Sequence, residues 1–236
     1  MIPDTEIHFP EQLRPGDIFL GPIGGLTGLG VGLGQLMLGE GFRVGRLSIR
    51  HAGIVVKAGV WPGPPAIAQA MPTGAEIVPL NWDKHWTERC AFVRLPEDYS
   101  GQAEDAAAIA RKMVEVGVGY SFLSYPSLAA YRLGFRQERL LRYINRRREP
   151  IDLPLKSAGV MYPSLPGRPG SVRVALPVEA ICSVFVDQAW SLAGKCVMDG
   201  VRPQAVTPGA LAETLMSYRD ATWVRPMGRS AKSYTI

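Results

Sequence analysis

Four short apolar runs, each bounded by turn residues, follow one another between residues 51 and 95. They are HAGIVVKAGV, AIAQA, EIVPL and CAFVRL, and an earlier run, IFL, follows the RPGD turn of residues 14–17. Runs of this length and composition are typical of strands, and most connections between them are short enough for hairpins. The sequence therefore predicts an antiparallel meander of four or five strands, against which the rest of the chain must pack.

Three segments outside this sheet have the composition and spacing of helices. Residues 102–116 are rich in alanine, and Gly117 follows them as a helix end. The segment VTPGALAETL begins with Thr207 as an N-cap and Pro208 at the first helical position. The segment VEAICSVFVDQAWSLAG has apolar residues that recur on one side of a helix: Ile181, Phe185, Ala189 and Leu192. The predicted fold class is α+β, with a sheet of about five strands packed against helices.

Composition excludes two broad classes of protein. Apolar residues make up 47% of the chain and charged residues 20%, which are the proportions of a folded globular protein rather than a disordered one. Three cysteines, Cys90, Cys182 and Cys196, are too few and too scattered for a disulfide framework, and no CxxC pair indicates zinc. We expect reduced thiols, no metal and no cofactor.

The sequence contains no pattern typical of export or of membrane insertion. It begins MIPDTEIHFPEQLRPGD, which has acids and prolines where a signal peptide has a basic flank and an apolar stretch. No uncharged apolar run reaches the ~18 residues of a membrane-spanning helix. We therefore expect neither secretion by the general route nor a transmembrane segment.

Much of the net charge of +5 comes from one segment, residues 126–177. Its first part is basic and its second part, MYPSLPGRPG, is rich in proline and glycine, which predicts an insertion that is part helix and part irregular. A helix here would be basic on one side and apolar on another. It could be an ordinary solvated face, or it could attract an anionic substrate, wall polymer or membrane surface. The arginines of this basic part are Arg136, Arg139, Arg142, Arg146, Arg147 and Arg148.

We predict no specific nucleic-acid partner.

Cys182 is the candidate nucleophile. It lies in the first turns of a predicted helix, where unpaired N–H groups and the helix dipole favour a thiolate. The alternative is that Cys182 is a small buried apolar residue, as most cysteines are. Cys90, in a strand-like run, and Cys196, after the helix, fit that alternative better.

His51 is the candidate base, because it begins a core strand whose rigid backbone could aim the ring. His8 lies near the N-terminus, and His85 lies in what resembles a surface turn. Gln69, on the next strand, is expected to alternate with Ile67 on the opposite face, so it could reach the imidazole across a hairpin and fix its tautomer. Taken singly, His51 and Gln69 would be ordinary polar residues of a sheet.

The order of these motifs resembles that of one enzyme superfamily. RPGDIFL is followed by HAGIVV, IAQA, a helix ending VGVGY, ICSVFVDQAW and VTPGALAETL. This order is similar to that of the papain-like, circularly permuted NlpC-type cysteine peptidases, whose sheet precedes the nucleophile helix, and to their YiiX-like and lecithin:retinol acyltransferase-like branch. The resemblance covers residues 11–123 and 178–216. It implies one catalytic domain over residues 1–236, with residues 126–177 inserted in it.

The resemblance also implies roles for particular residues. The family's nucleophile falls on Cys182, its base on His51 and its orienting residue on Gln69, where many permuted relatives have Glu or His. Tyr120 matches a tyrosine near the active site that can assist the oxyanion. Asp17 matches the acid of the GD turn, which holds backbone rather than taking part in chemistry.

The resemblance implies a thiol hydrolase that cleaves an amide bond, with peptidoglycan stem peptides as the favoured substrate. Two alternatives stay open: a lipid acyl hydrolase or transferase, and a catalytically silent binding module such as a phage tail component. The expected partner is a peptide or acyl-lipid substrate, and assembly into a larger complex is compatible with the sequence. The expected location is the cytoplasm, or a phage virion that carries the protein to a cell wall.

Overall fold

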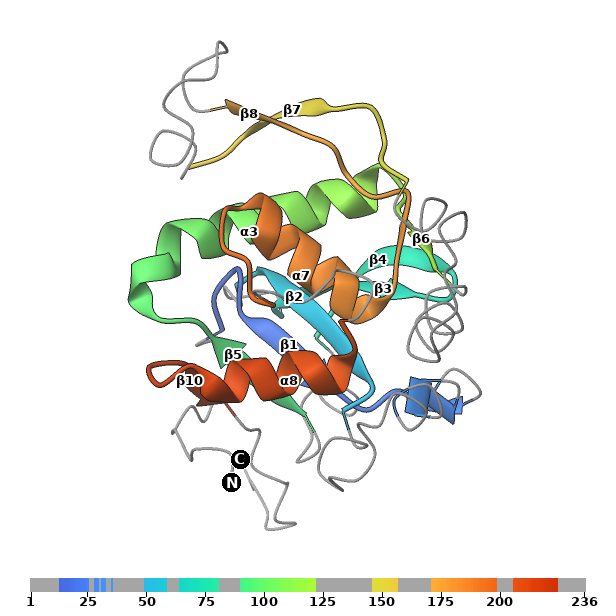
Figure 1. Cartoon of the computed structure of the whole chain (residues 1–236), viewed down its shortest axis with the longest axis vertical. Coiled ribbons are helices and arrows are strands. Elements are labelled where there is room, and N and C mark those ends of the chain that lie inside the picture. Colours follow the sequence, from blue (N-terminus) through green and yellow to red (C-terminus); the bar gives the residue numbers. More distant parts are fainter. Residues whose placement is uncertain are drawn as a thin grey trace, which may run out of the picture.

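The computed structural model describes residues 13–25, 28–29, 31–32, 35, 49–58, 64–80, 90–121, 146–156, 171–198 and 206–224. They form a mixed α+β structure in which a six-stranded antiparallel sheet packs against helices (Figure 1). The strands lie in the order β10 (Thr222–Val224), β5 (Ala91–Arg94), β1 (Ile18–Gly21), β2 (His51–Lys57), β3 (Ala66–Met71) and β4 (Gly74–Pro79). All five strands predicted from the apolar runs are confirmed.

The strand order corrects the predicted simple meander. Strands β1 to β4 follow one another as neighbours, but β5 returns to pair with the free edge of β1, where Ile18 lies opposite Val93. The burial of each strand explains this order. β4 is at most half-buried, as suits an edge strand, whereas Phe92 and Val93 are fully buried on opposite faces of β5, which requires an interior position. β10, which the sequence analysis missed, covers the outer edge of β5.

Two helices cover one face of the sheet: α3 (Ser100–Glu115) and α7 (Cys182–Leu192). α3 lies close to the predicted range of 102–116, and it packs through buried alanines such as Ala106 and Ala110. Gly117 ends α3 with a φ of 66°, a conformation that favours glycine. The η3 turn (Glu97–Tyr99) precedes α3 directly.

A third helix, α8 (Pro208–Ser217), packs against α7. The Thr207 hydroxyl accepts a hydrogen bond of 3.1 Å from the Ala210 N–H, and Pro208 is the first helical residue, so the predicted cap is confirmed. Among the described residues, no helix has both the length and the apolar character needed to cross a membrane.

The opposite face of the sheet carries a second, smaller apolar cluster. Alternation along β2 directs Ala52, Ile54 and Val56 toward the helices, and places His51, Gly53 and Val55 on this second face. The cluster consists of Leu13, Phe19, Val55, Ile67, Leu80, Cys90 and Phe92. β2 is thus buried on both faces, which gives His51 a rigid support at the start of the strand.

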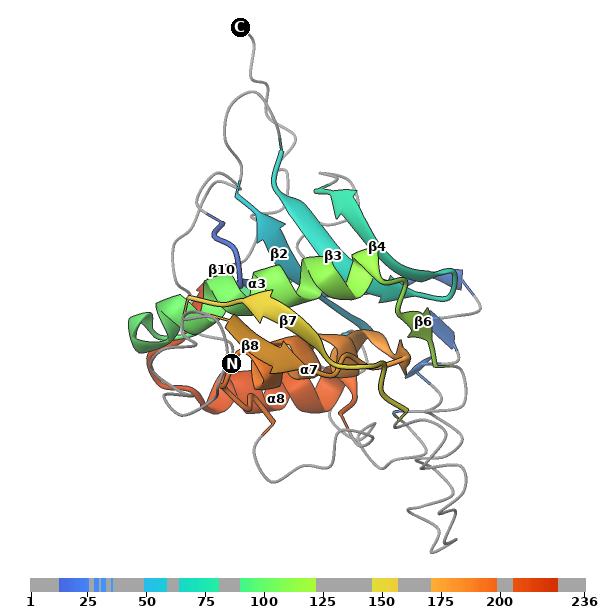
Figure 2. The same cartoon turned by 90° about the horizontal axis from the view of Figure 1, so that it is seen from above.

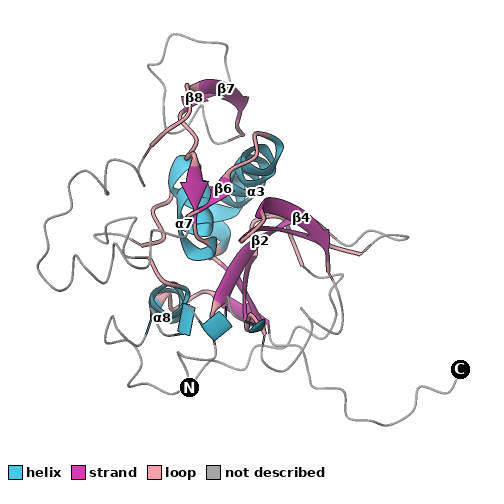
Figure 3. Ribbon diagram, turned by 90° about the vertical axis from the view of Figure 1, so that its right-hand side faces the viewer, coloured by secondary structure: helices cyan, strands magenta, loops and turns pink. Residues whose placement is uncertain are grey.

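The described part of the insertion is a β-ribbon, so the prediction of helix and irregular chain alone was wrong there. β7 (Ile151–Pro154) pairs antiparallel with β8 (Ser171–Val174). The ribbon lies on the side of α3 and α7 that faces away from the sheet (Figures 2 and 3). Its apolar residues alternate with polar ones, and the apolar ones are buried in the main core: Leu153, Leu155, Val172, Val174 and Leu176. The Lys156 N–H donates to the Asp105 carboxylate of α3 at 2.6 Å.

Candidate functional site

Cys182 is the first residue of α7, and its thiol lies against the start of β2. Cys182 Sγ is 4.0 Å from the carbonyl oxygen of Arg50, to which the thiol can donate, and the Ala52 N–H hydrogen-bonds to the sulfur. Arg50 and Ala52 flank His51 in the sequence. Contacts between the first turn of a helix and the first residues of a strand therefore bring Cys182 next to the backbone of the predicted base.

The Cys182 thiol is almost fully buried, with a relative exposure of 1%. This burial raises its pKa from 9.0 to about 11. The N–H groups of Ala52, Ser183 and Cys182 itself oppose the rise but are outweighed. The N–H groups at the start of the helix lower the thiol pKa, as expected, but the net shift is upward because removing an anion from water costs more than three backbone donors return.

A hydrogen bond joins His51 to Gln69 across strands β2 and β3. His51 Nε2 and Gln69 Oε1 are 2.7 Å apart, and both residues are only 4% exposed. In the sheet register Gly53 lies directly opposite Gln69, so His51 and Gln69 are diagonal neighbours on the same face, two positions apart. A glutamine is long enough to cross such a diagonal. The ring of Phe19 packs against the imidazole in an edge-to-face arrangement, with ring centroids 6.1 Å apart.

Gly53 leaves the space that this diagonal contact occupies. A Cβ atom built on Gly53 would lie 2.7 Å from Ile67 Cγ2, closer than real Cβ contacts, and 3.0 Å from the Ala68 carbonyl oxygen, which is an unusually tight contact. It would also lie 3.5 Å from Gln69 Cβ. The glycine of the HAG motif is therefore required by the close approach of β3.

Glu76 extends this network, although no motif in the sequence pointed to it. Glu76 lies opposite Gln69 in the β3–β4 hairpin, and Gln69 Nε2 donates to Glu76 Oε1 at 3.0 Å. The contact between Glu76 and Gln69 could have been predicted from the length of the turn between their strands. Met71 pairs with Gly74, so the turn consists only of Pro72 and Thr73. A two-residue connection fixes the register of the hairpin, and that register places residue 76 beside residue 69.

Tyr120 lies beside the start of α7, as the resemblance implies. β6 (Gly119–Tyr120) pairs in parallel with β9 (Glu179–Ala180), which leads directly into Cys182. Burial raises the pKa of the Tyr120 phenol, and the neighbouring Cys182 raises it further. The phenol therefore keeps its proton at every physiological pH and can act as a hydrogen-bond donor.

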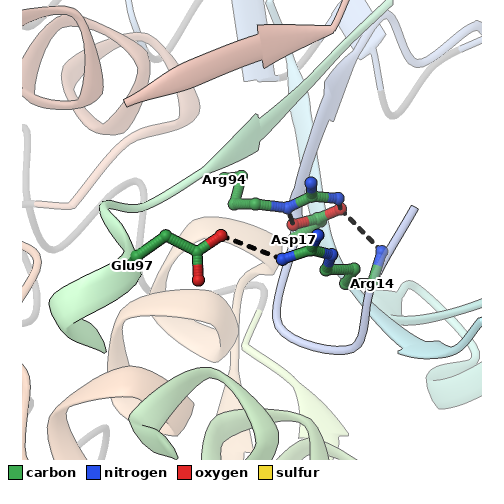
Figure 4. Close-up of polar contacts among 4 residues, drawn as sticks. All are labelled: Arg14, Asp17, Arg94 and Glu97. Carbon is green, nitrogen blue, oxygen red and sulfur yellow. Dashed lines mark hydrogen bonds and ion pairs between the residues drawn. The ribbon is translucent and has the colours of Figure 1, made fainter. Parts of the chain in front are cut away.

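The Asp17 carboxylate holds the backbone of the turn before β1 in place, in agreement with the role that its motif implies. Its carboxylate accepts from the Arg14 N–H at 2.8 Å and from the Arg94 guanidinium at 2.9 and 2.7 Å, which ties the turn before β1 to β5 (Figure 4). Burial raises the pKa of Asp17, and the ion pair with Arg94 opposes the rise. Arg14 and Glu97 form a separate, exposed ion pair of 2.9 Å.

A cavity of about 250 Å³ lies next to this cluster rather than at the thiol. Arg94, Ala103 and Trp190 are among the residues that line it. Trp190 is eight residues beyond Cys182 on α7, which is about 12 Å along the helix axis. The cavity is therefore remote from the candidate nucleophile.

The other candidates for chemistry are placed as follows. Cys90 is buried in the second apolar cluster and Cys196 is exposed. His8 and His85 lie outside the described residues. Within the part of the chain that the structure describes, no group of three or more His, Cys, Asp or Glu residues could hold a metal ion.

The predicted basic helix lies mostly outside the described residues, including Arg136, Arg139 and Arg142. Arg146 and Arg147 are described and exposed, and the Arg147 guanidinium donates to Gln188 Oε1 on α7. The basic segment therefore contacts α7 at its described end. Its affinity for an anionic partner stays a prediction.

The arrangement assembles a buried thiol, an imidazole bonded to an amide oxygen, and a phenol at the start of α7. A comparison with protein-family models finds none that matches this chain, and a comparison with curated proteins finds no match either.

Proposed function

We propose that this chain is a cysteine hydrolase with a permuted NlpC-type fold, and that it cleaves an amide bond through Cys182, His51, Gln69 and Tyr120. The observation that carries the proposal is the hydrogen bond between His51 and Gln69, next to the backbone on which the Cys182 thiol rests. The order of the chain supports the fold, because β1 to β5 precede α7 and Cys182 is the first residue of that helix.

In the first step, Cys182 Sγ–H gives its proton to the imidazole nitrogen of His51 that does not face Gln69. The Sγ–C bond forms as the carbonyl π pair moves onto oxygen. Because burial raises the thiol pKa, the proton moves during attack rather than in a preformed thiolate–imidazolium pair. The Gln69 amide oxygen stabilises the imidazolium that results.

The tetrahedral intermediate collapses when the oxyanion re-forms the carbonyl and the C–N bond breaks. The leaving amine takes the proton from His51, which leaves a thioester on Cys182. A water molecule then gives a proton to His51 and attacks the thioester. Collapse releases a carboxylic acid and returns the proton to the Cys182 sulfur.

Donors for the oxyanion are available at the start of α7. Ile181 is the N-cap and provides no side-chain cap, so the N–H groups of Cys182 and Ser183 in the first turn can face a developing charge. Tyr120 keeps its phenolic proton and is the third donor of the proposed site.

The substrate class follows from the resemblance, which favours the stem peptides of peptidoglycan. Phospholipid acyl groups are the second class to be tested. The decisive experiment incubates the purified protein with defined muropeptides and, separately, with phospholipid vesicles, and identifies the products by mass spectrometry. A peptide product that Cys182→Ala abolishes and Cys196→Ala preserves supports the proposal, since Cys196 is an exposed cysteine that has no role in the proposed reaction.

Other results would replace the proposal. A free fatty acid or acyl-transfer product from the vesicles, again dependent on Cys182, would assign the chain to lipid chemistry. An absence of product from both substrates with correctly folded protein would favour the silent binding module, for instance a virion component.

A further inference from the structure

Glu76 determines which way the Gln69 side chain faces. The two ends of an amide side chain have the same shape but opposite hydrogen-bonding character, so only the partners decide its orientation. A carboxylate accepts hydrogen bonds and has none to donate. The 3.0 Å contact with Glu76 Oε1 therefore requires the NH₂ group of Gln69 at that end, which turns the amide oxygen toward His51.

The orientation of Gln69 in turn determines where the proton of His51 lies. The Gln69 oxygen is an acceptor only, so the 2.7 Å contact requires that His51 Nε2 carries a hydrogen. In the neutral ring, the lone pair is then on Nδ1. A ring with the opposite tautomer would have its lone pair buried against Gln69, away from any thiol.

We propose that Glu76 is a positioning residue that acts through Gln69 to hold His51 in the tautomer with a basic Nδ1. The catalytic meaning of this inference depends on the proposed function, since Nδ1 is then the nitrogen that takes the Cys182 proton. The tautomer itself is a property of the resting protein and can be measured without turnover. Glu76 lies on β4, with β3 between it and the strand of His51, so its effect on His51 passes through Gln69.

The strand register makes this action specific to residue 76. The pair Gln69–Glu76 is one rung of the β3–β4 hairpin, and the network runs across the sheet from Glu76 on β4 through Gln69 on β3 to His51 on β2. Since one strand supplies each member, a change in hydrogen-bonding character at residue 76 can reach His51 without moving the strands.

The test uses three substitutions that differ in hydrogen-bonding character. Glu76→Gln can accept from Gln69 or donate to it, Glu76→Lys can only donate, and Glu76→Ala can do neither. Long-range ¹H–¹⁵N correlation spectra of protein labelled at histidine, recorded at a pH where imidazole is neutral, report the tautomer of His51. The wild type should show a single Nε2–H form, and Glu76→Gln should keep Nε2–H as one of its populated forms. Glu76→Lys should show the Nδ1–H form as the major species, because Gln69 then turns its oxygen to the lysine.

The control is Glu149→Lys, which makes the same charge change at an exposed glutamate outside the network and should leave the tautomer unchanged. If Glu76→Lys fails to fold, Glu76→Ala replaces it and should show a mixture of both forms. A pure Nε2–H form in a folded Glu76→Lys or Glu76→Ala protein would overturn the proposal.

Activity gives a second readout that separates this inference from the proposed function. If a substrate is found, Glu76→Lys should lower kcat by about 100-fold or more, the range of a general base, with little change in KM. Glu76→Gln should stay within a few-fold of the wild type. If the wild type has no activity, the proposed function fails while the tautomer result still decides the role of Glu76.

Discussion

The thiol of Cys182 rests against the Arg50 carbonyl oxygen, with 4.0 Å between sulfur and oxygen, although 132 positions separate the two residues in the chain. This contact joins the first residue of α7 to the residue before β2. The position of the Cys182 thiol, the nucleophile of the proposed reaction, is therefore determined by the backbone of the sheet rather than by a mobile side chain. The same backbone carries His51, so one rigid element positions both members of the pair.

The first prediction concerns Gly53. Replacing it with alanine forces Ile67 and the backbone of Ala68 to move, because the new Cβ would lie 2.7 and 3.0 Å from their atoms. We expect Gly53→Ala to lower the free energy of unfolding by about 1–3 kcal/mol, as overpacked cores do. Urea denaturation measures the change.

Gly101→Ala is the matched control for Gly53→Ala. Gly101 lies in α3, and a Cβ atom added to it would meet nothing within 4 Å, so the stability should stay constant or rise by up to ~1 kcal/mol. Equal effects of the two substitutions would show that the space at Gly53 is not required.

The sequence contains enough information to predict five of the six strands of the main sheet, the helices α3, α7 and α8, and the residues Cys182, His51 and Gln69, and the reasons are local. β2 and β3 are indicated by their own apolar residues, and Thr207 and Gly117 mark helix ends by their own hydrogen bonds and φ angle. The place of β5 beside β1 could not be predicted in this way, because it depends on which strand must be buried on both faces.

The raised pKa of Cys182 could not be predicted either. It follows from how completely α7, β2 and their neighbours enclose the sulfur, which is a property of tertiary packing. Glu76 lies between these cases. The two-residue turn between β3 and β4, which is visible in the sequence, determines that Glu76 lies beside Gln69. The role of Glu76 can be inferred only from the structure, where Gln69 hydrogen-bonds to His51.

The second prediction concerns the buried ion pair of Asp17 and Arg94. Replacing Arg94 with methionine leaves the Asp17 carboxylate buried without its cation, which we expect to cost about 3–5 kcal/mol at neutral pH. Burial already raises the pKa of Asp17, and loss of Arg94 removes the largest opposing effect. The native state then favours the protonated acid more strongly, so the loss should shrink as the pH falls toward 4.

Arg14→Met is the control for that substitution. The Arg14–Glu97 pair is exposed on both sides, so its loss should change stability by about 0–1 kcal/mol, and the backbone N–H of residue 14 still bonds Asp17. Denaturation curves at pH 4 and pH 7 compare the two variants. A pH-independent loss in Arg94→Met would contradict the ion-pair explanation.

The third prediction uses the alkaline stability of the protein. The folded-state pKa of Cys182, about 11, lies above its ordinary value of 9.0, so the stability that the buried thiol contributes is present below pH 9 and is lost as the pH rises to 11. Two pKa units correspond to about 2–3 kcal/mol. Over this range the wild type should lose more stability than Cys182→Ala by that amount. Tyrosines and lysines titrate in both proteins, so the difference isolates Cys182, and parallel curves would refute the raised pKa.

The last prediction concerns the chemical reactivity of the three thiols. At pH 8 the thiolate fraction of a group with a pKa near 11 is about 100-fold smaller than that of an ordinary thiol with a pKa of 9.0. In the resting protein, iodoacetamide should therefore modify exposed Cys196 first and Cys182 slowly, as followed by mass spectrometry of the digested protein.

The pH dependence of the modification rate shows whether Cys182 reacts slowly because little of it is thiolate or because the reagent cannot reach it. The rate at Cys182 should rise about tenfold per pH unit up to pH 11. A rate at Cys182 that is already constant between pH 6 and 8 would indicate a preformed pair with His51, and His51→Ala should then abolish that plateau. In that case proton transfer precedes attack. With the steep profile that we expect, the imidazole takes the proton only when a carbonyl carbon accepts the sulfur.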